Sequence, residues 1–358
     1  MRKEEIHEVI KLINSVKTEA SKTDSDKTTP FPPELKAIEF EIPINVENIP
    51  PCIAVDGSYT FLFSLLGADT WIVLFRIALM EYKISRKNSK IHYLQNSPPK
   101  YFDHLTVISF HPDILKQQLS IYREIASGTV QYQERKASLF ASSLLSYYEQ
   151  RALEKITEER SNCIILKDGA LLSYKALPRT SMYEPILKNC RENAIQFGGI
   201  SKSTQMRFFK NIFTDDYFLT RFYNRRFPQP SYIPISENYF KTQTRYDVWG
   251  KVYLAKLHEA APKWFRVDIG YDAENTQALF SALGAYSKYH LLPGYPIPLI
   301  EAHKLAKSVR DLKGLYEGEL IDYLKQIGIS PEEFITGEVD FEGREYGSFH
   351  DLLDQLSK

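Results

Sequence analysis

Two aspartates of this chain each follow a short apolar segment and directly precede a glycine. Asp56 lies in CIAVDGS (52–58) and Asp168 in NCIILKDGA (162–170). An aspartate before glycine is commonly a turn-former, because its carboxylate accepts local backbone hydrogen bonds and glycine adopts a positive φ. The repetition favours a second interpretation, in which two strand ends at one sheet edge bring the carboxylates together as oxygen ligands for a divalent cation.

Glu149 is a third candidate acid, on the clearest predicted helix, residues 137–156. At 100° per residue its carboxylate shares a face with Leu145, Leu153 and Ile156, which is the kind of face that packs inward. An ionised carboxylate buried without a partner costs several kcal/mol. The side chain therefore needs a salt bridge to a core lysine or arginine, hydrogen bonds from nearby serines, or a metal ion shared with the two aspartates.

The motif GYPIPLIEAHKLAK (294–307) and the motif GISKST (199–204) add three polar candidates. His303 lies about one and a half turns into the predicted helix, where a neutral imidazole can bind a metal or accept a proton from water. A satisfied core histidine is the alternative. Tyr295 can reach the same cavity from the preceding loop. Lys202 either stabilises charge on a phosphate or is a solvated loop lysine.

Phosphodiester hydrolysis is a reaction that needs such a set of residues. Two cations about 3.5–4 Å apart can activate water and stabilise the leaving oxygen. Mg²⁺ or Mn²⁺ held by carboxylates does this without redox chemistry. A histidine supplies a further ligand or a proton acceptor, and a lysine adds positive charge near the phosphate. The candidate residues therefore predict a metal-dependent hydrolytic site.

The segment 207–227 interleaves cations with eight aromatic side chains. Its predicted DNA-binding residues are Arg207, Lys210, Arg221, Arg225 and Arg226. Cations bind phosphates and aromatic faces stack on bases, so the segment is a suitable lining for a single strand. An ordinary amphipathic helix with a solvated basic face fits the same pattern.

The elements that must position these residues alternate between strands and helices, which predicts a mixed α/β fold. The predicted strands are 52–55, one or more within 69–85, 164–167, one within 193–204 that ends in a loop, and a hairpin of 253–258 with 264–270. The predicted helices are 1–22, 137–156, 275–290 and 299–312, with part of 207–227. A polar, proline-containing linker covers 21–36.

Composition excludes several classes of protein. Lys plus Arg and Asp plus Glu both number 45, so the overall field attracts no polyanion, although a local basic channel is compatible with this balance. Cys52, Cys163 and Cys190 lack CxxC spacing and predict neither a disulfide framework nor a zinc site. The N-terminus has no apolar signal core, and Asp69 and Arg76 interrupt the most apolar region. These features predict a cytoplasmic protein without a membrane span.

The ordered set of motifs resembles the NurA nucleases. In order they are AVDGS (54–58), Glu149 on its helix, LKDGALLS (166–173), GISKS (199–203), WFRVDI (264–269) and GYPIPLIEAHKLA (294–306). The resemblance covers roughly residues 45–310. The intervals of nineteen residues from Glu149 to Asp168 and eight from Tyr295 to His303 fit it as well.

The resemblance implies an RNase H-like nuclease core, a mixed central sheet flanked by helices. The amphipathic N-terminus and the acidic, amphipathic tail lie outside it and predict helical additions at both termini. The predicted layout is an N-terminal helix and linker (1–44), a nuclease domain (45–311) and an appended C-terminal element (312–358). Carried over by motif, the implied metal ligands are Asp56, Glu149, Asp168 and His303, with Tyr295 and Lys202 assisting and Asp268 a weaker candidate. The implied cofactor is Mn²⁺ or Mg²⁺, with two ions per active site.

The resemblance also implies an activity and partners. Such proteins act as 5′–3′ exonucleases and single-strand endonucleases, and form homodimers around a DNA channel. They resect DNA ends for double-strand break repair by homologous recombination with HerA, a hexameric translocating ATPase. This chain has no GxxxxGK[ST] motif, so an outside ATPase would supply translocation. The alternatives are a non-catalytic RNase H-like adaptor for such an ATPase, and a nuclease of this fold that acts on RNA or on junctions.

Overall fold

The computed structural model describes residues 36–65, 70–88, 90–109, 137–174, 183–209, 213–241, 246–270, 275–328, 330, 335–339 and 345–346. The chain divides into two units, Met1–Ile38 and Glu39–Lys358, and the described helices and the strands from β2 onward belong to the second. The predicted helix over 1–22 and the predicted DNA-binding residue Lys210 lie outside the described residues. Strand β1 is Ile38–Glu39.

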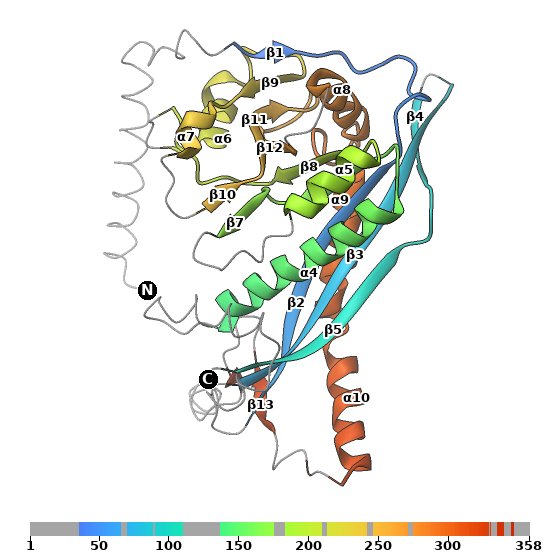
Figure 1. The fold of residues 1–358 in the computed structure, drawn as a ribbon, viewed down its shortest axis with the longest axis vertical. Coiled ribbons are helices and arrows are strands. Elements are labelled where there is room, and N and C mark those ends of the chain that lie inside the picture. The colour runs from blue at the N-terminus through green and yellow to red at the C-terminus, as the bar shows by residue number, and fades with distance from the viewer. Residues whose placement is uncertain are drawn as a thin grey trace, which may run out of the picture. The chain divides into compact units, whose positions relative to one another are not determined.

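A mixed sheet organises the second unit (Figure 1). Its core strands are β2 (Cys52–Leu65), β3 (Thr70–Lys87), β5 (Lys100–Ser109), β6 (Ile164–Asp168) and β8 (Gln196–Ser201). Strand β3 runs antiparallel between β2 and β5. Strand β6 lies between β2 and β8 and runs parallel to both. The order β5-β3-β2-β6-β8 is that of an RNase H-like sheet, so the predicted fold class is confirmed.

The sheet continues beyond this core on both sides. Antiparallel strands β12 (Phe265–Gly270), β11 (Gly250–Lys256) and β9 (Ser231–Pro234) follow β8, and β11 with β12 forms the predicted hairpin. Strand β4 (Lys90–Gln95) pairs with β3. Near the C-terminus, β13 (Ile335–Val339) pairs with the far end of β2 and with β14 (Glu345–Tyr346). Strands β7 (Leu172–Tyr174) and β10 (Tyr246–Val248) form a separate pair.

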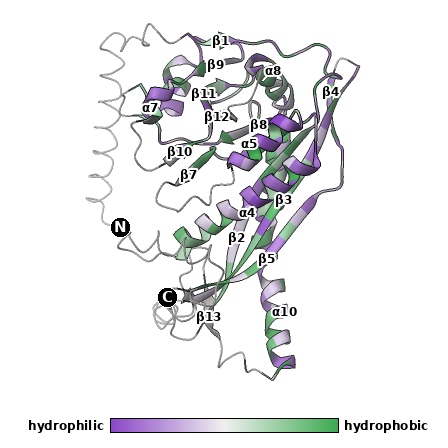
Figure 2. Ribbon diagram, viewed as in Figure 1, coloured by the Kyte–Doolittle hydropathy of each residue, from purple (hydrophilic) through white to green (hydrophobic). Residues whose placement is uncertain are grey.

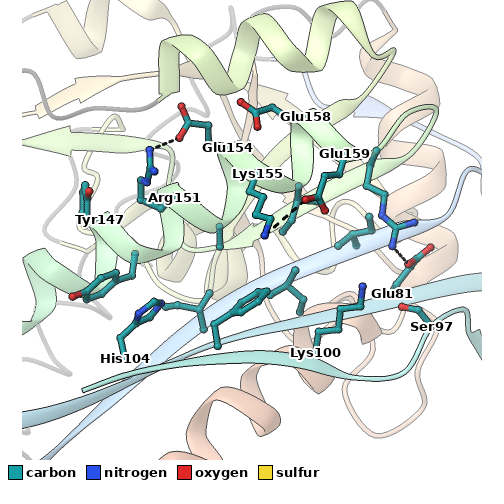
Figure 3. A pocket seen from close by; sticks show the side chains of 18 residues that line it. Glu81, Ser97, Lys100, His104, Tyr147, Arg151, Glu154, Lys155, Glu158 and Glu159 are labelled. Carbon is teal, nitrogen blue, oxygen red and sulfur yellow. Dashed lines mark hydrogen bonds and ion pairs between the residues drawn. The ribbon is translucent and has the colours of Figure 1, made fainter. Parts of the chain in front are cut away.

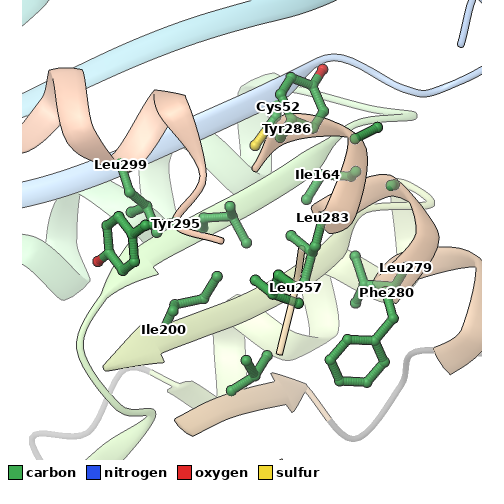
Figure 4. Close-up of a cluster of buried hydrophobic side chains, with 14 of the residues drawn as sticks. Cys52, Ile164, Ile200, Leu257, Leu279, Phe280, Leu283, Tyr286, Tyr295 and Leu299 are labelled. Carbon is green, nitrogen blue, oxygen red and sulfur yellow. The ribbon is translucent and has the colours of Figure 1, made fainter. Parts of the chain in front are cut away.

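Helices cover both faces of the sheet (Figure 1). Side chains alternate along β2, because successive residues of a strand point to opposite faces. Ile53 and Val55 pack with α4 (Ala137–Glu159) and α5 (Tyr183–Glu192). Cys52 and Ala54 belong to the opposite cluster with α8 (Thr276–Tyr286) and α9 (Ile297–Asp311), part of which is drawn in Figure 4.

Helix α4 packs against two different apolar clusters of the sheet. Its N-terminal half packs Phe140 and Leu144 against Phe61 and Phe75 of the long strands. Its colour accordingly changes from hydrophobic at the N-terminal end to hydrophilic toward the C-terminal end in Figure 2. Among the described helices, none combines the length and the apolar character that crossing a bilayer requires. The remaining helical elements are α6 (Asp215–Phe218), the π-helix η1 (Leu219–Tyr223), α7 (Glu237–Lys241) and α10 (Lys313–Gln326).

A buried arginine attaches the C-terminal helices to the sheet. Arg76 of β3 is 2% exposed and donates two hydrogen bonds, of 2.8 and 2.7 Å, to the carboxylate of Asp103. It also donates to Ser308 of α9 at 2.8 Å and to Tyr316 of α10 at 2.9 Å. The charge predicted to interrupt the apolar region is therefore buried with a full set of partners, and α10 is the predicted helical addition at the C-terminal end.

The two Asp-Gly pairs have different structural roles. Residues 168 and 169 behave as predicted, since Asp168 ends β6 and Gly169 turns with φ of 104°. The prediction that Asp56 ends a strand is wrong, because β2 continues for nine residues beyond it, to Leu65. Gly57 is not a turn residue here. A Cβ at this position would lie 2.7 Å from Leu145 and 2.9 Å from Glu149, so the glycine lets α4 approach the strand.

Gly199→Ala should destabilise the fold by about 1–3 kcal/mol. A Cβ on Gly199 would lie 2.4 Å from the backbone oxygen of Gly169 and 3.0 Å from Leu171, so the turn after Asp168 would have to move. The matched control is Gly314→Ala on α10, where a Cβ would meet no atom within 4 Å. Alanine there should raise the free energy of unfolding by about 0.5–1 kcal/mol. Urea unfolding midpoints measure both changes, and equal midpoints for Gly199→Ala and the parent would contradict the prediction.

Candidate metal centre

Asp56, Asp168 and His303 meet at one place. Each offers one ligand atom, and these atoms all lie within 4.8 Å of one another. The parallel register pairs Val55 with Lys167, so Asp56 and Asp168 are adjacent on neighbouring strands and point to the same face. That face carries α9, whose His303 places Nδ1 2.7 Å from Oδ2 of Asp56 and 3.9 Å from Oδ2 of Asp168.

The three side chains differ in exposure. Those of Asp56 and Asp168 are 8% and 11% exposed, whereas the imidazole of His303 is 47% exposed. The centre is therefore a partly enclosed acidic site that opens toward solvent on the histidine side. Two carboxylate oxygens and an imidazole nitrogen are a donor set that suits Mn²⁺ or Mg²⁺. Within the described part of the chain, these three residues are the group whose ligand atoms fit one ion.

Asp168 is the most heavily constrained member. Burial and the neighbouring charge of Asp56 raise the pKa of its carboxyl, although Lys202 and Tyr295 oppose this shift. The ammonium of Lys202 pairs with Oδ2, and the hydroxyl of Tyr295 donates to Oδ1 at 3.1 Å. Burial and Asp168 raise the pKa of Tyr295 far above its usual value, so its proton stays available for donation. The structure thus brings both predicted assisting residues to the site.

Glu149 lies beside this group and has a different partner. Its carboxylate pairs with the ammonium of Lys167 at 2.8 Å, and the two side chains are 7% and 9% exposed. Lys167 alternates with Asp168 along β6, so it faces α4 on the other side of the sheet. The salt bridge that the sequence left open as an alternative is therefore present. A role for Glu149 as a metal ligand stays a prediction.

The Glu149–Lys167 pair is coupled to the aspartates by charge. Burial raises the pKa of Glu149, and Asp56 and Asp168 raise it further, while Lys167 lowers it. Burial alone would lower the pKa of Lys167, but Glu149 outweighs it and the net shift is upward. Lys167 also donates to the backbone oxygen of Asp168 at 3.0 Å. The lysine was not singled out from sequence, although a lysine within an apolar strand next to Asp-Gly was a usable signal.

Asp268 is not in the ligand group, but it binds the loop that follows Asp168. It is fully buried on β12 and accepts two hydrogen bonds from Arg266, at 2.7 and 2.9 Å. It also accepts the backbone N–H of Leu171 at 2.9 Å. Asp268 therefore holds the loop that follows Asp168 against the neighbouring hairpin.

The predicted DNA-binding segment is helical in part, as expected, and lies outside the ligand group. The side chains of Arg207, Arg221, Arg225 and Arg226 are all exposed. Several aromatic rings of the segment pack on one another, including Phe218 against Phe209, Phe222 and Tyr223. Much of the predicted stacking surface is thus a small core, while the cations face solvent.

A separate cavity of about 1120 Å³ lies between α4 and strands β3 and β5 (Figure 3). Apolar side chains such as Ile77 and Leu79 line it together with charged residues of α4. Glu81 at its end pairs with Arg160 at 2.9 Å. None of its lining residues is a candidate ligand, so the cavity is not the metal centre.

The topology and the acid–histidine cluster define the class of protein, a mixed α/β chain with an RNase H-like sheet and a candidate metal centre on it. The particular fold is NurA-like. A solved structure of the NurA nuclease from Sulfolobus solfataricus matches 90% of this chain and 98% of its own, with a TM-score of 0.53 and 13% identity. The resemblance carried by the motifs is confirmed at the level of the fold.

Two further solved structures are similar over most of the chain. A second NurA structure matches 88% of this chain and 97% of its own, with 10% identity and a TM-score of 0.47. Human ENDOV matches 77% and 92%, with 9% identity and a TM-score of 0.38. No protein-family model matches the sequence, and no curated protein matches it either.

Lys167→Met should destabilise the protein by about 3–5 kcal/mol, because it leaves the Glu149 carboxylate buried without its cation. Adding Glu149→Gln should recover much of this loss, and the coupling free energy comes from urea unfolding of both single variants and the double. Lys188→Met is the control. Its pair with Glu192 spans 3.8 Å and is largely exposed, so the change should be within about 0.5 kcal/mol. If the changes in unfolding free energy of the two single variants simply add in the double variant, a direct interaction between Glu149 and Lys167 is contradicted.

Mn²⁺ should raise the Tm by several degrees, since an ion held at a hundredfold excess over its Kd stabilises by about 2.7 kcal/mol. The raised pKa of Asp168 means that protons compete with the ion more strongly than at an ordinary aspartate, so the shift should shrink as the pH is lowered from neutrality. Asp56→Asn should abolish the shift and Asp322→Asn, on the exposed side of α10, should retain it. Identical melting curves with and without Mn²⁺ would argue against the centre.

Proposed function

We propose that this chain is a divalent-metal-dependent deoxyribonuclease that hydrolyses phosphodiester bonds. The observation that carries the proposal is the convergence of Asp56, Asp168 and His303 on one face of an RNase H-like sheet. The NurA-like fold supports it. The substrate class rests on this likeness and on the exposed arginines of the segment 207–227.

In the proposed site, Asp56, Asp168 and His303 would hold Mn²⁺ or Mg²⁺. A bound ion there supplies Lewis acidity and lowers the pKa of a water molecule. Tyr295 orients the Asp168 carboxylate through its hydrogen bond. Lys202 places a positive charge next to the same carboxylate, where it can also meet a phosphate oxygen. His303 is the most exposed of the three, so the site opens to solvent and substrate on its side.

A second ion would need further ligands, and Glu149 is the candidate. Its carboxylate already has a cation, Lys167, whose charge partly offsets that of the acid cluster. We retain two ions per site as part of the proposal, with Glu149 as the additional ligand. The cleavage rate of the double variant Glu149→Gln, Lys167→Met tests this role. If the variant is stable and cleaves like the parent, Glu149 is a structural carboxylate, and if it is stable and inactive, Glu149 is a ligand.

The proposed biological role follows the NurA-like fold. The protein would act as a cytoplasmic homodimer on single- and double-stranded DNA ends with 5′–3′ polarity and on single strands as an endonuclease. It would resect ends for double-strand break repair by homologous recombination with a HerA-type hexameric ATPase. The absence of GxxxxGK[ST] from the sequence agrees with an outside motor. We place the nuclease domain at 45–311, between the N-terminal segment 1–44 and the appended element 312–358.

A non-catalytic adaptor for a DNA-translocating ATPase is the second candidate. One observation favours it, because each carboxylate of the site has a partner within the protein. Asp56 contacts His303, Asp168 contacts Lys202 and Tyr295, and Glu149 contacts Lys167. An adaptor predicts that these acids serve stability alone and that no ion binds.

Cleavage of end-labelled DNA tests the proposal. The purified protein should degrade 5′- and 3′-labelled single strands and duplexes with Mn²⁺ or Mg²⁺ and not with EDTA. Asp56→Asn and Asp168→Asn should each lower the rate by at least about 100-fold while DNA binding is kept. Asp322→Asn is the matched control and should cleave like the parent.

The pattern of label release decides polarity. Release of 5′-terminal mononucleotides first indicates 5′–3′ digestion. Retention of full cleavage by Asp56→Asn and Asp168→Asn would overturn the assigned centre. Failure of the parent to cleave with either ion, alone and with a HerA-type ATPase added, would support the adaptor.

A further inference from the structure

A second lysine lies next to Lys202 at the edge of the metal centre. Lys263, in the connection between β11 and β12, donates from its ammonium to the backbone oxygen of Lys202. Lys202 in turn pairs with Asp168. The ammonium of Lys263 is thus held at the backbone of the residue whose own ammonium contacts a candidate metal ligand.

Two packed aromatic rings support these lysines. The ammonium of Lys263 lies 5.2 Å from the ring centre of Phe265, and that of Lys202 lies 5.7 Å from the ring centre of Tyr295. The rings themselves are 5.3 Å apart. Cations over aromatic faces are favourable and fix the direction of the side chain. Both ammonium groups are therefore oriented by the rings beneath them.

The charges of the two lysines are balanced differently. Lys202 has a carboxylate partner, whereas the ion pairs of the described residues include none for Lys263, whose hydrogen-bond partner is a neutral carbonyl. The side chain of Lys263 is half-buried. A positive charge that has no counterion among the described residues, beside an acidic centre, is the feature expected of a group that meets an anion from solution.

The connection that carries Lys263 also contacts the basic segment. The backbone N–H of Trp264 donates to Thr220 at 3.0 Å, and Asn224 donates to the backbone oxygen of Ala261 at 3.4 Å. The rings of Phe227 and Trp264 pack edge to face at 5.9 Å. The connection that carries Lys263 therefore contacts Lys202 on one side, and on the other Thr220, Asn224 and Phe227, which flank the exposed arginines at 221, 225 and 226 in the sequence.

We propose that Lys263 binds a backbone phosphate of the DNA strand next to the scissile one, on the side of the metal centre that leads to the basic segment. The inference rests on the proposed nuclease function and adds a substrate contact that the motifs did not indicate. Lys202 serves the scissile phosphate, and Lys263 serves its neighbour. A strand would then run from the aspartates past Lys263 toward Arg225 and Arg226.

Lys263→Met tests this, because methionine keeps a long apolar stem over Phe265 and removes the charge. Binding of a fluorescent 20-mer single strand is measured by anisotropy across salt concentrations, in an Asp56→Asn background that prevents cleavage. The expected result is about fivefold weaker binding and a salt slope that falls by about 0.7, the value for one lost phosphate contact on a single strand. Lys263→Arg should restore both quantities. Lys251→Met, on an exposed position of β11, is the control and should change neither.

Hydrolysis of bis(p-nitrophenyl) phosphate separates phosphate binding from a structural role. This small diester has no neighbouring phosphate, so Lys263→Met with Asp56 intact should hydrolyse it at the parent's rate while KM for the oligonucleotide rises. An equal loss on both substrates would show that Lys263 acts only by holding Lys202, and an unchanged salt slope would show that it meets no phosphate. Either result overturns the inference. If the parent cleaves nothing, the proposed function fails, while the anisotropy series still decides the role of Lys263.

Discussion

The parallel pairing of β2 with β6 is the constraint on which the site depends. Its register aligns Val55 with Lys167, so one residue further on the two aspartates stand side by side on the α9 face. The same alternation sends Lys167 to the α4 face, where it meets Glu149. A shift of one residue in this register would exchange the two faces, separating the aspartates from His303.

The arrangement resolves an electrostatic problem. Three carboxylates lie close together, and two of them have raised pKa values because burial and mutual repulsion disfavour their charged forms. Lys167 offsets the charge from within the protein, and Lys202 from its edge. Burying so many charges adds little to stability on its own. Its value lies in holding several polar groups in one geometry, which a site for a cation and a phosphate requires.

The sequence was sufficient to predict the acidic residues of the site, but it did not indicate Lys167 or Lys263, which only the fold connects to them. The apolar segments before Asp56 and Asp168 and the periodicity around Glu149 were readable, and all three acids lie in one neighbourhood. The pattern could not show that β2 continues past Gly57, because Asp-Gly is also a turn signal and only the approach of α4 decides between them. Nor could helical periodicity show that Glu149 forms its salt bridge with Lys167, since that lysine lies on a strand, β6. Lys263 carries no local signal, because the backbone oxygen that it binds belongs to Lys202, 61 positions away in the chain.

The contact between Asp56 and His303 joins residues 247 positions apart. Asp56 is made early in translation, Asp168 near the middle, and His303 only when α9 leaves the ribosome. Contacts of such long range form late, after the loops between them have closed. The histidine and Tyr295 are made after all five core strands, β2, β3, β5, β6 and β8. A chain that ends before residue 295 lacks the partner of Asp56 and the hydroxyl donor of Asp168, so the centre is complete only after the last of its elements has been made.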